Sequence, residues 1–229
     1  MFIGHYAPAF VAASSRRSPR LGAMFVAAQF VDLFFFLFVL LGIERMREVP
    51  GHTIMNPGEF YHMPYTHSLI GTLGFAGLWA LVVRLRRGDW RLAWIGAAVV
   101  ASHWLLDLIV HAPDLTLLGI GRRYGLALWN DPAVAMPLEL GLTALALTFY
   151  VSRTRAVGVA GHVALAALVL ALLASQGVHW FAPQPTRIVD PVRASVPLTA
   201  LLAYAILTAL AWWTGATRVM RTGPRRSTL

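Results

Sequence analysis

Long apolar runs, separated by short stretches that contain Arg, Pro or Gly, dominate the chain. A helix needs about 20 apolar residues to cross a bilayer. The runs predict membrane-spanning helices at 22–43, 68–83, 92–110, 133–151, 157–181 and 194–214. The first fourteen residues are also apolar, but as a helix they would extend only about 21 Å, which predicts a short re-entrant or half-buried helix. We therefore expect an all-α polytopic bundle that forms one integral membrane domain over residues 1–229.

The composition narrows the chemistry that such a bundle can perform. Of the 229 residues, 58% are hydrophobic and only 13% are charged, which excludes a separate aqueous catalytic domain. The chain has no cysteine, so any bound metal must be held by His and carboxylate side chains. All 19 basic residues are arginines, and in so apolar a chain they favour topology signals and contacts with lipid phosphates over nucleic-acid binding.

The distribution of the arginines predicts the orientation in the membrane. Thirteen lie in the N-terminal segment, in the loops after the second and fourth spans and in the C-terminal tail, whereas six lie in the opposite loops. Positively charged loops remain in the cytoplasm. We therefore expect both termini in the cytoplasm, and the loops that contain His62, Trp129 and Asp190 outside.

Several ionisable residues interrupt the apolar runs. An ionisable side chain at membrane depth normally faces the bundle interior or a water-filled cavity and indicates a functional site. Counting about 1.5 Å per helical residue from the nearest cytoplasmic arginine places these side chains roughly 16–25 Å into the membrane. At this depth we expect six residues to converge in the outer half of the bundle: His5, Asp32, His67, His103, Asp107 and Glu139.

Two groups of histidines stand out within this set. His103, Asp107 and His111 are four residues apart and lie along one stripe of the third span. His103 and Asp107, one turn apart, could chelate one ion, or they could simply hydrogen-bond to each other or to neighbouring helices. His62 and His67 lie where the preceding outer loop enters the second span, and such loop-plus-helix ligands are typical of the mouth of a metal site.

Other polar residues have weaker interpretations. His111 and Asp114 could orient His103. Glu139 could complete the site or pair with the arginines at 122–123.

The charged residues at 44–48 favour a solvated ion-pair network at the outer end of the first span. His162 and His179 lie about 26 Å apart along the fifth span and cannot share one metal.

The combined motifs resemble the YdjM/YbcI family of membrane-bound proteins predicted to be metal-dependent hydrolases. The matching features are Gly4-His5, Asp32, the His62-x4-His67-Ser68 motif and the Ser102-His103-x-x-Leu106-Asp107 motif. The resemblance covers residues 1–114, and the spans at 133–214 add only bulk hydrophobicity. It implies a multi-pass protein of the bacterial inner membrane, a divalent metal site and phospholipase-like activity. The metal ligands that it implies are His5, Asp32, His62, His67, His103 and Asp107.

Histidine with carboxylate ligands suits zinc, our first expectation, and also manganese or iron. Such a metal would activate water for hydrolysis of a lipid-like phosphoester or ester from the outer side of the bilayer. We expect Asp32, His67, His103 and Asp107 to form the catalytic set, and spacing does not decide which carboxylate is ligand and which is base. Two alternatives stay open: a proton- or ion-coupled transporter, and a non-catalytic protein whose polar groups only join helices.

Overall fold

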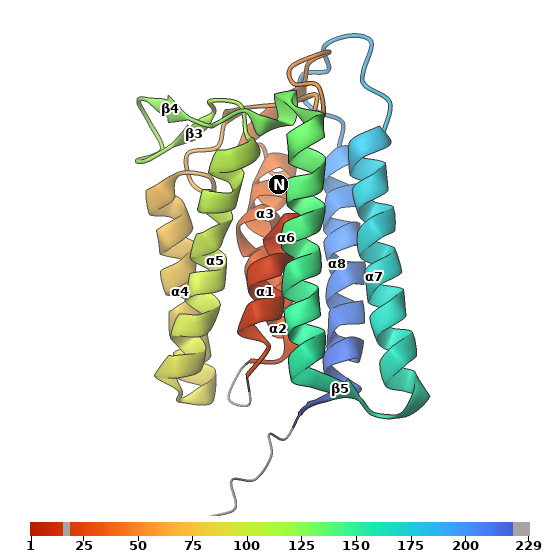
Figure 1. Cartoon of the computed structure of the whole chain (residues 1–229). Coiled ribbons are helices and arrows are strands. Elements are labelled where there is room, and N and C mark those ends of the chain that lie inside the picture. The colour runs from red at the N-terminus through yellow and green to blue at the C-terminus, as the bar shows by residue number, and fades with distance from the viewer. Residues whose placement is uncertain (16–18, 222–229) are drawn as a thin grey trace, which may run out of the picture.

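Five long helices and one bent helix pair form the frame of the molecule. The computed structural model describes residues 1–15 and 19–221. Within these residues, the helices long and apolar enough to cross a membrane are α4 (Leu69–Arg87), α5 (Trp90–Val110), α6 (Pro132–Arg153), α7 (Gly158–Phe181) and α8 (Ser195–Ala216). A sixth candidate span is the pair α2 (Leu21–Ala28) and α3 (Phe30–Leu40). The predicted all-α bundle with about six spans is confirmed (Figure 1).

The first span is bent by 50° between α2 and α3. The break lies at Gln29, whose buried amide has no hydrogen-bond partner among the described residues. The carbonyl oxygens at the end of a helix lack intrahelical donors, and at Ala28 this oxygen lies 3.0 Å from Nδ1 of His103. Asp32 lies in the first turn of α3, directly after the break. The bend was not predicted, because the apolar run continues through it.

The connection between α4 and α5 shows how local sequence ends and starts the helices. Gly88 ends α4 with a positive φ of 69°, a conformation that glycine adopts without steric cost. The carboxylate of Asp89 then caps α5 by accepting from the backbone N–H groups of Arg91 and Leu92. At its other end, α4 begins after Ser68, whose hydroxyl oxygen accepts from the N–H of Gly71. This cap fixes the chain next to His67.

A short helical segment fills the centre of the bundle, as Figure 1 shows. It consists of η1 (Ile3–His5) and α1 (Tyr6–Ala12), and it packs against α2, α5 and α6. Glu139 of α6 accepts hydrogen bonds from the backbone N–H groups of Phe2 and Gly4 and from Nε2 of Gln176. Glu139 therefore holds the N-terminal segment and makes no ion pair with the arginines at 122–123.

The predicted cytoplasmic location of the N-terminus stays a prediction. Met1 is buried inside the bundle, and its backbone nitrogen lies 2.7 Å from Oδ1 of Asp107. The predicted location of the C-terminus falls on residues 222–229, outside the described part of the chain. Arg16, Arg17, Arg225 and Arg226, on which the predicted orientation partly rests, also lie outside it.

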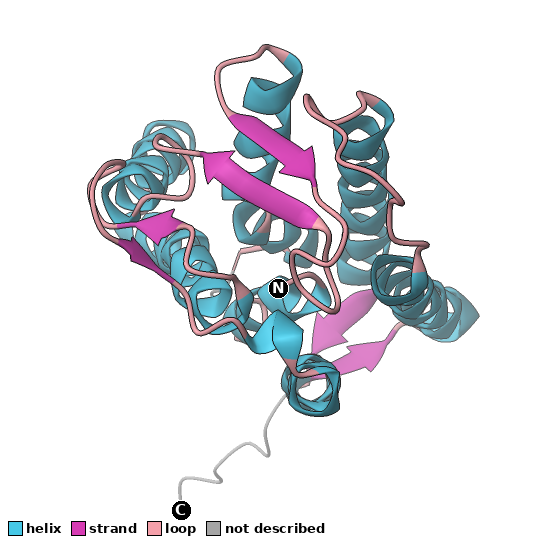
Figure 2. Cartoon of the chain, turned by 90° about the horizontal axis from the view of Figure 1, so that it is seen from above, coloured by secondary structure: helices cyan, strands magenta, loops and turns pink. Residues whose placement is uncertain are grey.

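Short hairpins join the helices at the two ends of the bundle. At one end, β1 (Arg45–Glu48) pairs antiparallel with β2 (Gly58–His62), and β3 (Leu115–Thr116) pairs with β4 (Arg123–Tyr124). This end also carries η2 (Leu128–Asn130) and the α7–α8 loop. Figure 2 shows the β1–β2 hairpin lying across this end. At the opposite end, β5 (Thr154–Ala156) pairs with β6 (Arg218–Met220).

The β1–β2 hairpin is fastened to the α7–α8 loop by charged and polar groups. The guanidinium of Arg47 lies 2.6 Å from Glu59 and 3.6 Å from Asp190, and the hydroxyl of Tyr61 donates to Asp190. Hydrogen bonding to Arg47 holds the pKa of the partly exposed Glu59 carboxyl below its usual value. Backbone hydrogen bonds between Glu48 and Val189 complete the connection. The hairpin therefore covers the bundle in a fixed position.

We predict that Glu139→Ala destabilises the packing of the N-terminal segment. The change leaves the buried N–H of Gly4 and the partly buried N–H of Phe2 without their acceptor, and an unpaired buried donor costs about 1–3 kcal/mol. The free energy of unfolding in detergent, measured by circular dichroism, should fall by that order. Glu139→Gln keeps an acceptor oxygen and is the control. Equal stability of Glu139→Ala and the unchanged chain would contradict this role.

Candidate metal centre

Five of the six predicted metal ligands converge in the centre of the bundle. They come from η1, α3, α5 and the residue before the cap of α4. Two overlapping groups have ligand atoms within 4.8 Å of one another: His5, His103 and Asp107, and Asp32, His67 and His103. Four of the five side chains are buried, and Asp32 is 15% exposed. The predicted convergence in depth therefore describes these five residues correctly.

Asp107 lies at the middle of the cluster and faces histidines with both oxygens. Its Oδ1 lies 3.0 Å from Nε2 of His5 and 3.5 Å from Nε2 of His111. Its Oδ2 lies 3.0 Å from Nε2 of His103 and 3.6 Å from Nε2 of His67. The predicted stripe of His103, Asp107 and His111 along α5 thus contributes three neighbouring members of one cluster.

Asp32 faces two of the same histidines, His67 and His103. Its Oδ1 lies 3.2 Å from Nε2 of His67 and 3.4 Å from Nε2 of His103. Its Oδ2 accepts a hydrogen bond of 2.9 Å from the hydroxyl of Tyr204 on α8. Nε2 of His67 and Nε2 of His103 are thus each placed between two carboxylates.

Hydrogen bonds at the other ring nitrogen fix the orientation of His103 on α5 and of His111, which directly follows α5. Nδ1–H of His103 donates to the carbonyl oxygen of Ala28, at the break between α2 and α3. Nδ1–H of His111 donates to Oδ1 of Asp114, at 3.0 Å. His111, and not His103, is therefore the residue that Asp114 orients.

His67 is oriented by a chain of two residues. The hydroxyl of Thr66 donates to Oε2 of Glu44 at 2.6 Å, so the Thr66 oxygen accepts from Nδ1–H of His67 at 2.9 Å. Oε1 of Glu44 also accepts from the backbone N–H groups of Tyr65 and Thr66. The buried Glu44 is part of this chain, so its predicted place in a solvated ion-pair network is wrong.

These contacts assign the protons of three rings. A neutral imidazole carries one N–H, and in His67, His103 and His111 that N–H is at Nδ1, so Nε2 bears a lone pair. Each lone pair faces carboxylate oxygens, which also carry only lone pairs. The backbone nitrogen of Met1 offsets part of this repulsion at Oδ1 of Asp107, 2.7 Å away. The rest of the repulsion is relieved by a cation between the groups or by second protons on the rings.

The donor set fits a divalent metal ion. Ligand atoms about 2.1 Å from a tetrahedral zinc lie about 3.4 Å apart. The separations between Nε2 and carboxylate oxygens are 3.0–3.6 Å. Nε2 of His103 is buried and has no hydrogen-bond partner among the described residues. Metal-binding histidines usually donate their second N–H to a carbonyl or carboxylate, as His103 and His111 do here.

His62 does not join the cluster. It lies in β2 opposite Arg45, and its side chain is exposed. The spacing of His62 and His67 suggested a shared site, but a strand places His62 on the surface of the hairpin while Ser68 and Thr66 hold His67 inside. The implied role of His62 as a ligand is corrected by this geometry.

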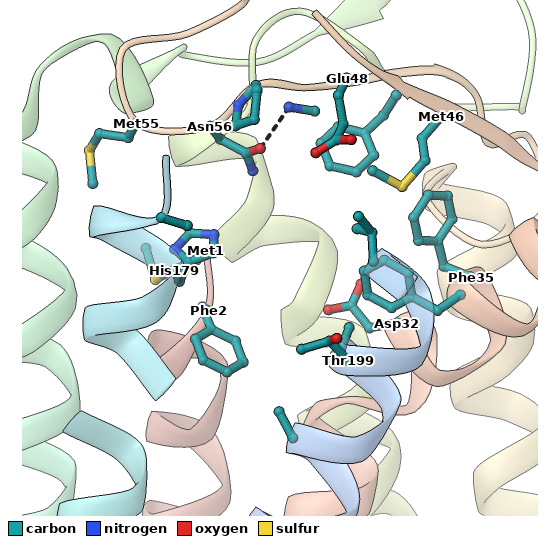
Figure 3. Close-up of a pocket in the computed structure, with 18 of the residues that line it drawn as sticks. Met1, Phe2, Asp32, Phe35, Met46, Glu48, Met55, Asn56, His179 and Thr199 are labelled. Carbon is teal, nitrogen blue, oxygen red and sulfur yellow. Dashed lines mark hydrogen bonds between the residues drawn. The ribbon is translucent and has the colours of Figure 1, made fainter. Parts of the chain in front are cut away.

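A cavity of about 530 Å³ lies next to the cluster, below the β1–β2 hairpin. Asp32, His67, Asp107 and His111 contribute to its lining. Figure 3 shows Asp32 on one side of this space and His179 with Phe2 on the other. Most of the remaining walls are apolar or aromatic, so the cavity offers the cluster a partly dry reaction space.

The last three spans supply more than bulk hydrophobicity. Tyr204 of α8 binds Asp32, and Glu139 of α6 with Gln176 of α7 holds the segment that carries His5. His179 lines the cavity, and its buried Nδ1 has no hydrogen-bond partner in the described part of the chain. No feature of the sequence singled out Tyr204, since tyrosines in a span are common and the residues on either side of it are apolar.

Comparisons with protein-family models, with curated proteins and with solved structures each gave no match. The resemblance to the YdjM/YbcI family therefore stays a prediction that rests on the motifs alone.

We predict that Thr66→Val weakens metal binding by about 10- to 100-fold, the usual effect of removing a hydrogen-bond partner of a metal-binding histidine. Valine keeps the shape of threonine but offers Nδ1 of His67 no acceptor. Zinc titration of the purified protein against a competing chelator measures the change. His62→Ala is the control, because its exposed side chain touches no member of the cluster. Unchanged zinc affinity in Thr66→Val would contradict this orientation of His67.

Proposed function

We propose that the chain is a membrane-bound metal-dependent hydrolase that acts on a lipid-like phosphoester or ester. The observation that supports this most is the placement of two overlapping groups of ligand atoms, which share His103, at the wall of a cavity. When bound, a divalent metal would supply Lewis acidity that polarises the substrate oxygen and lowers the pKa of water. His5, Asp32, His67, His103 and Asp107 are the residues proposed to hold it, with zinc as our first choice and manganese or iron as alternatives.

The two carboxylates differ in what they can do in hydrolysis. Asp107 is almost fully buried, and its Oδ1 pairs with the backbone nitrogen of Met1 as well as with His5. Its Oδ2 faces the Nε2 atoms of His103 and His67, so a ligand role suits this oxygen. Asp32 is 15% exposed, lines the cavity and is held by Tyr204. In hydrolysis, water attacks the phosphorus or carbonyl carbon and loses a proton, while the leaving oxygen gains one. Asp32 is the carboxylate placed to take the proton from water.

The transporter alternative receives less support from the geometry. Transport needs access to the site from both sides of the membrane. On the side of β5 and β6, an apolar core packs below the cluster in the described part of the chain and includes Phe10, Phe25, Val100, Leu168 and Leu207. The cavity lies on the opposite side, below the β1–β2 hairpin. A site beside a cavity on the hairpin side of the bundle suits hydrolysis better than transport.

A purely structural role for the polar groups also receives less support. Polar residues that only join helices would pair off separately. Here both Asp32 and Asp107 face the same two histidines, His67 and His103. This sharing joins the four residues in one network, which suits a cation better than a set of independent helix contacts.

We further propose the bacterial inner membrane as the location, with the cavity open to the outer side. The arginine distribution supports this orientation. The three loops that contain His62, Trp129 and Asp190 gather at one end of the bundle, the end nearest the cavity (Figure 1).

We predict that the purified protein binds at least one equivalent of zinc and hydrolyses bis(p-nitrophenyl) phosphate, a generic phosphodiester probe. The double change His103→Ala, Asp107→Ala removes two shared ligands and should abolish both properties. His162→Ala, which changes a histidine near the opposite end of α7, should retain both. Elemental analysis and release of p-nitrophenol measure the outcome. Zinc binding without hydrolysis would contradict the catalytic role, and no zinc after reconstitution would contradict the metal site as well.

A further inference from the structure

The cavity beside the metal centre has a polar floor and an apolar wall. The floor consists of the exposed parts of Asp32, His67, Asp107 and His111. The wall on the α8 side consists of Val196, Thr199, Ala200 and Ala203, which also line the cavity. A ligand that fills this space therefore has one end against the polar floor and the other end against the apolar wall.

Small side chains on α8 make this wall a continuous surface. Val196, Ala200 and Ala203 follow a helical spacing of four and three residues, so they share one face of the helix. Over seven residues this face extends about 10 Å along the helix axis. Phe36 of α3 lies across from it, as another lining residue. The space between α3 and α8 is therefore bordered by apolar groups along two turns.

The cavity reaches the surface near the ends of α7 and α8 that lie at the hairpin side. Val178 lines the cavity and is nevertheless 65% exposed, and Ser195 and Thr199 are exposed lining residues as well. These positions lie within two turns of the helix ends. In a membrane, this opening lies at the level of the lipid head groups and the adjoining acyl chains.

The volume limits what can enter. At about 530 Å³, the cavity lies in the middle of the range of about 300–1,000 Å³ that is typical of sites for small ligands. A two-chain phospholipid is considerably larger than such ligands. One short chain with its head group fits this size and also the division into a polar floor and an apolar wall.

We propose that the substrate is an amphiphile with one apolar chain, which lies along α8 while its phosphoryl head group reaches the metal centre. The inference rests on the proposed hydrolase function and names its substrate class. A phosphoryl group suits the floor because a metal held by histidine and carboxylate groups binds anionic oxygens. The single chain suits the narrow apolar wall of Ala200 and Ala203.

The test uses alkylphosphonates, which cannot be hydrolysed, with zinc-loaded protein kept in amphipol to avoid competing detergent. Binding of methyl-, butyl-, hexyl- and octylphosphonate is measured by isothermal titration calorimetry. Burial of each added methylene should tighten binding by up to about fourfold until the wall is covered. Affinity that does not change from methyl- to octylphosphonate would overturn the proposal.

A pair of matched variants localises the chain. Ala200→Phe fills the proposed path, whereas Ala205→Phe adds the same ring to the exposed face of the same helix. We expect Ala200→Phe to weaken binding of octylphosphonate at least tenfold, to leave methylphosphonate binding unchanged and to retain zinc. Ala205→Phe should change none of these. Equal octylphosphonate affinity in both variants would overturn the proposal.

Two further measurements separate this inference from the proposed function. Zinc content is determined in every sample, because absence of zinc in the unchanged protein would overturn the hydrolase proposal itself. Binding of dihexanoyl phosphatidic acid, which has two chains, is compared with that of octylphosphonate. Binding as tight as that of octylphosphonate, with the same sensitivity to Ala200→Phe, would overturn the single-chain assignment while leaving the metal site intact.

Discussion

The negative charges of Asp32 and Asp107, two carboxylates placed among histidine nitrogens inside the bundle, must be balanced by positive charge close to them. Removing an unpaired charge from water costs several kcal/mol even after the protein has relaxed. Asp32 and Asp107 are therefore acceptable in the membrane interior only if positive charge lies within a few ångströms. The backbone nitrogen of Met1, 2.7 Å from Oδ1 of Asp107, supplies part of it, and protons on the rings or a metal ion can supply the rest. The Nδ1 contacts of His67, His103 and His111 leave the Nε2 atoms available to either.

The surrounding fold can be understood as support for that cluster. The bend at Gln29 frees the carbonyl of Ala28 for His103, and the buried Glu44 holds His67 through Thr66. Glu139 binds the backbone of the segment that delivers His5. These contacts come from segments far apart in the sequence, so the cluster forms only when the bundle has assembled.

Much of the fold and part of the site followed from the sequence. Apolar runs of about 20 residues have few alternatives to membrane-spanning helices, so the number and bounds of the spans were predicted closely. The sequence also predicted that five side chains lie at a similar height along the bundle, because a helix rises by a fixed amount per residue. These are His5, Asp32, His67, His103 and Asp107. These two regularities depend on local geometry alone.

Predictions that depended on the loops were less successful. His62 was expected in the site, but the outer loop folds into a hairpin whose strand places this side chain at the surface. Glu44 was expected in a solvated network, since its neighbours are charged, yet it turns inward to accept three hydrogen bonds. Tyr204 was not foreseen, because its partner Asp32 is distant in the sequence and only tertiary packing joins them.

X-ray absorption spectroscopy of the zinc-reconstituted protein addresses the metal centre most directly. It reports the atoms around the ion without requiring a known substrate. The structure predicts a first shell of nitrogen and oxygen atoms at about 2.0–2.2 Å, with outer-shell scattering from at least two imidazole rings. In the His103→Ala, Asp107→Ala variant this signature should disappear. A zinc ion surrounded only by oxygen atoms, or imidazole scattering that persists in the variant, would contradict the assignment of this cluster as the metal centre.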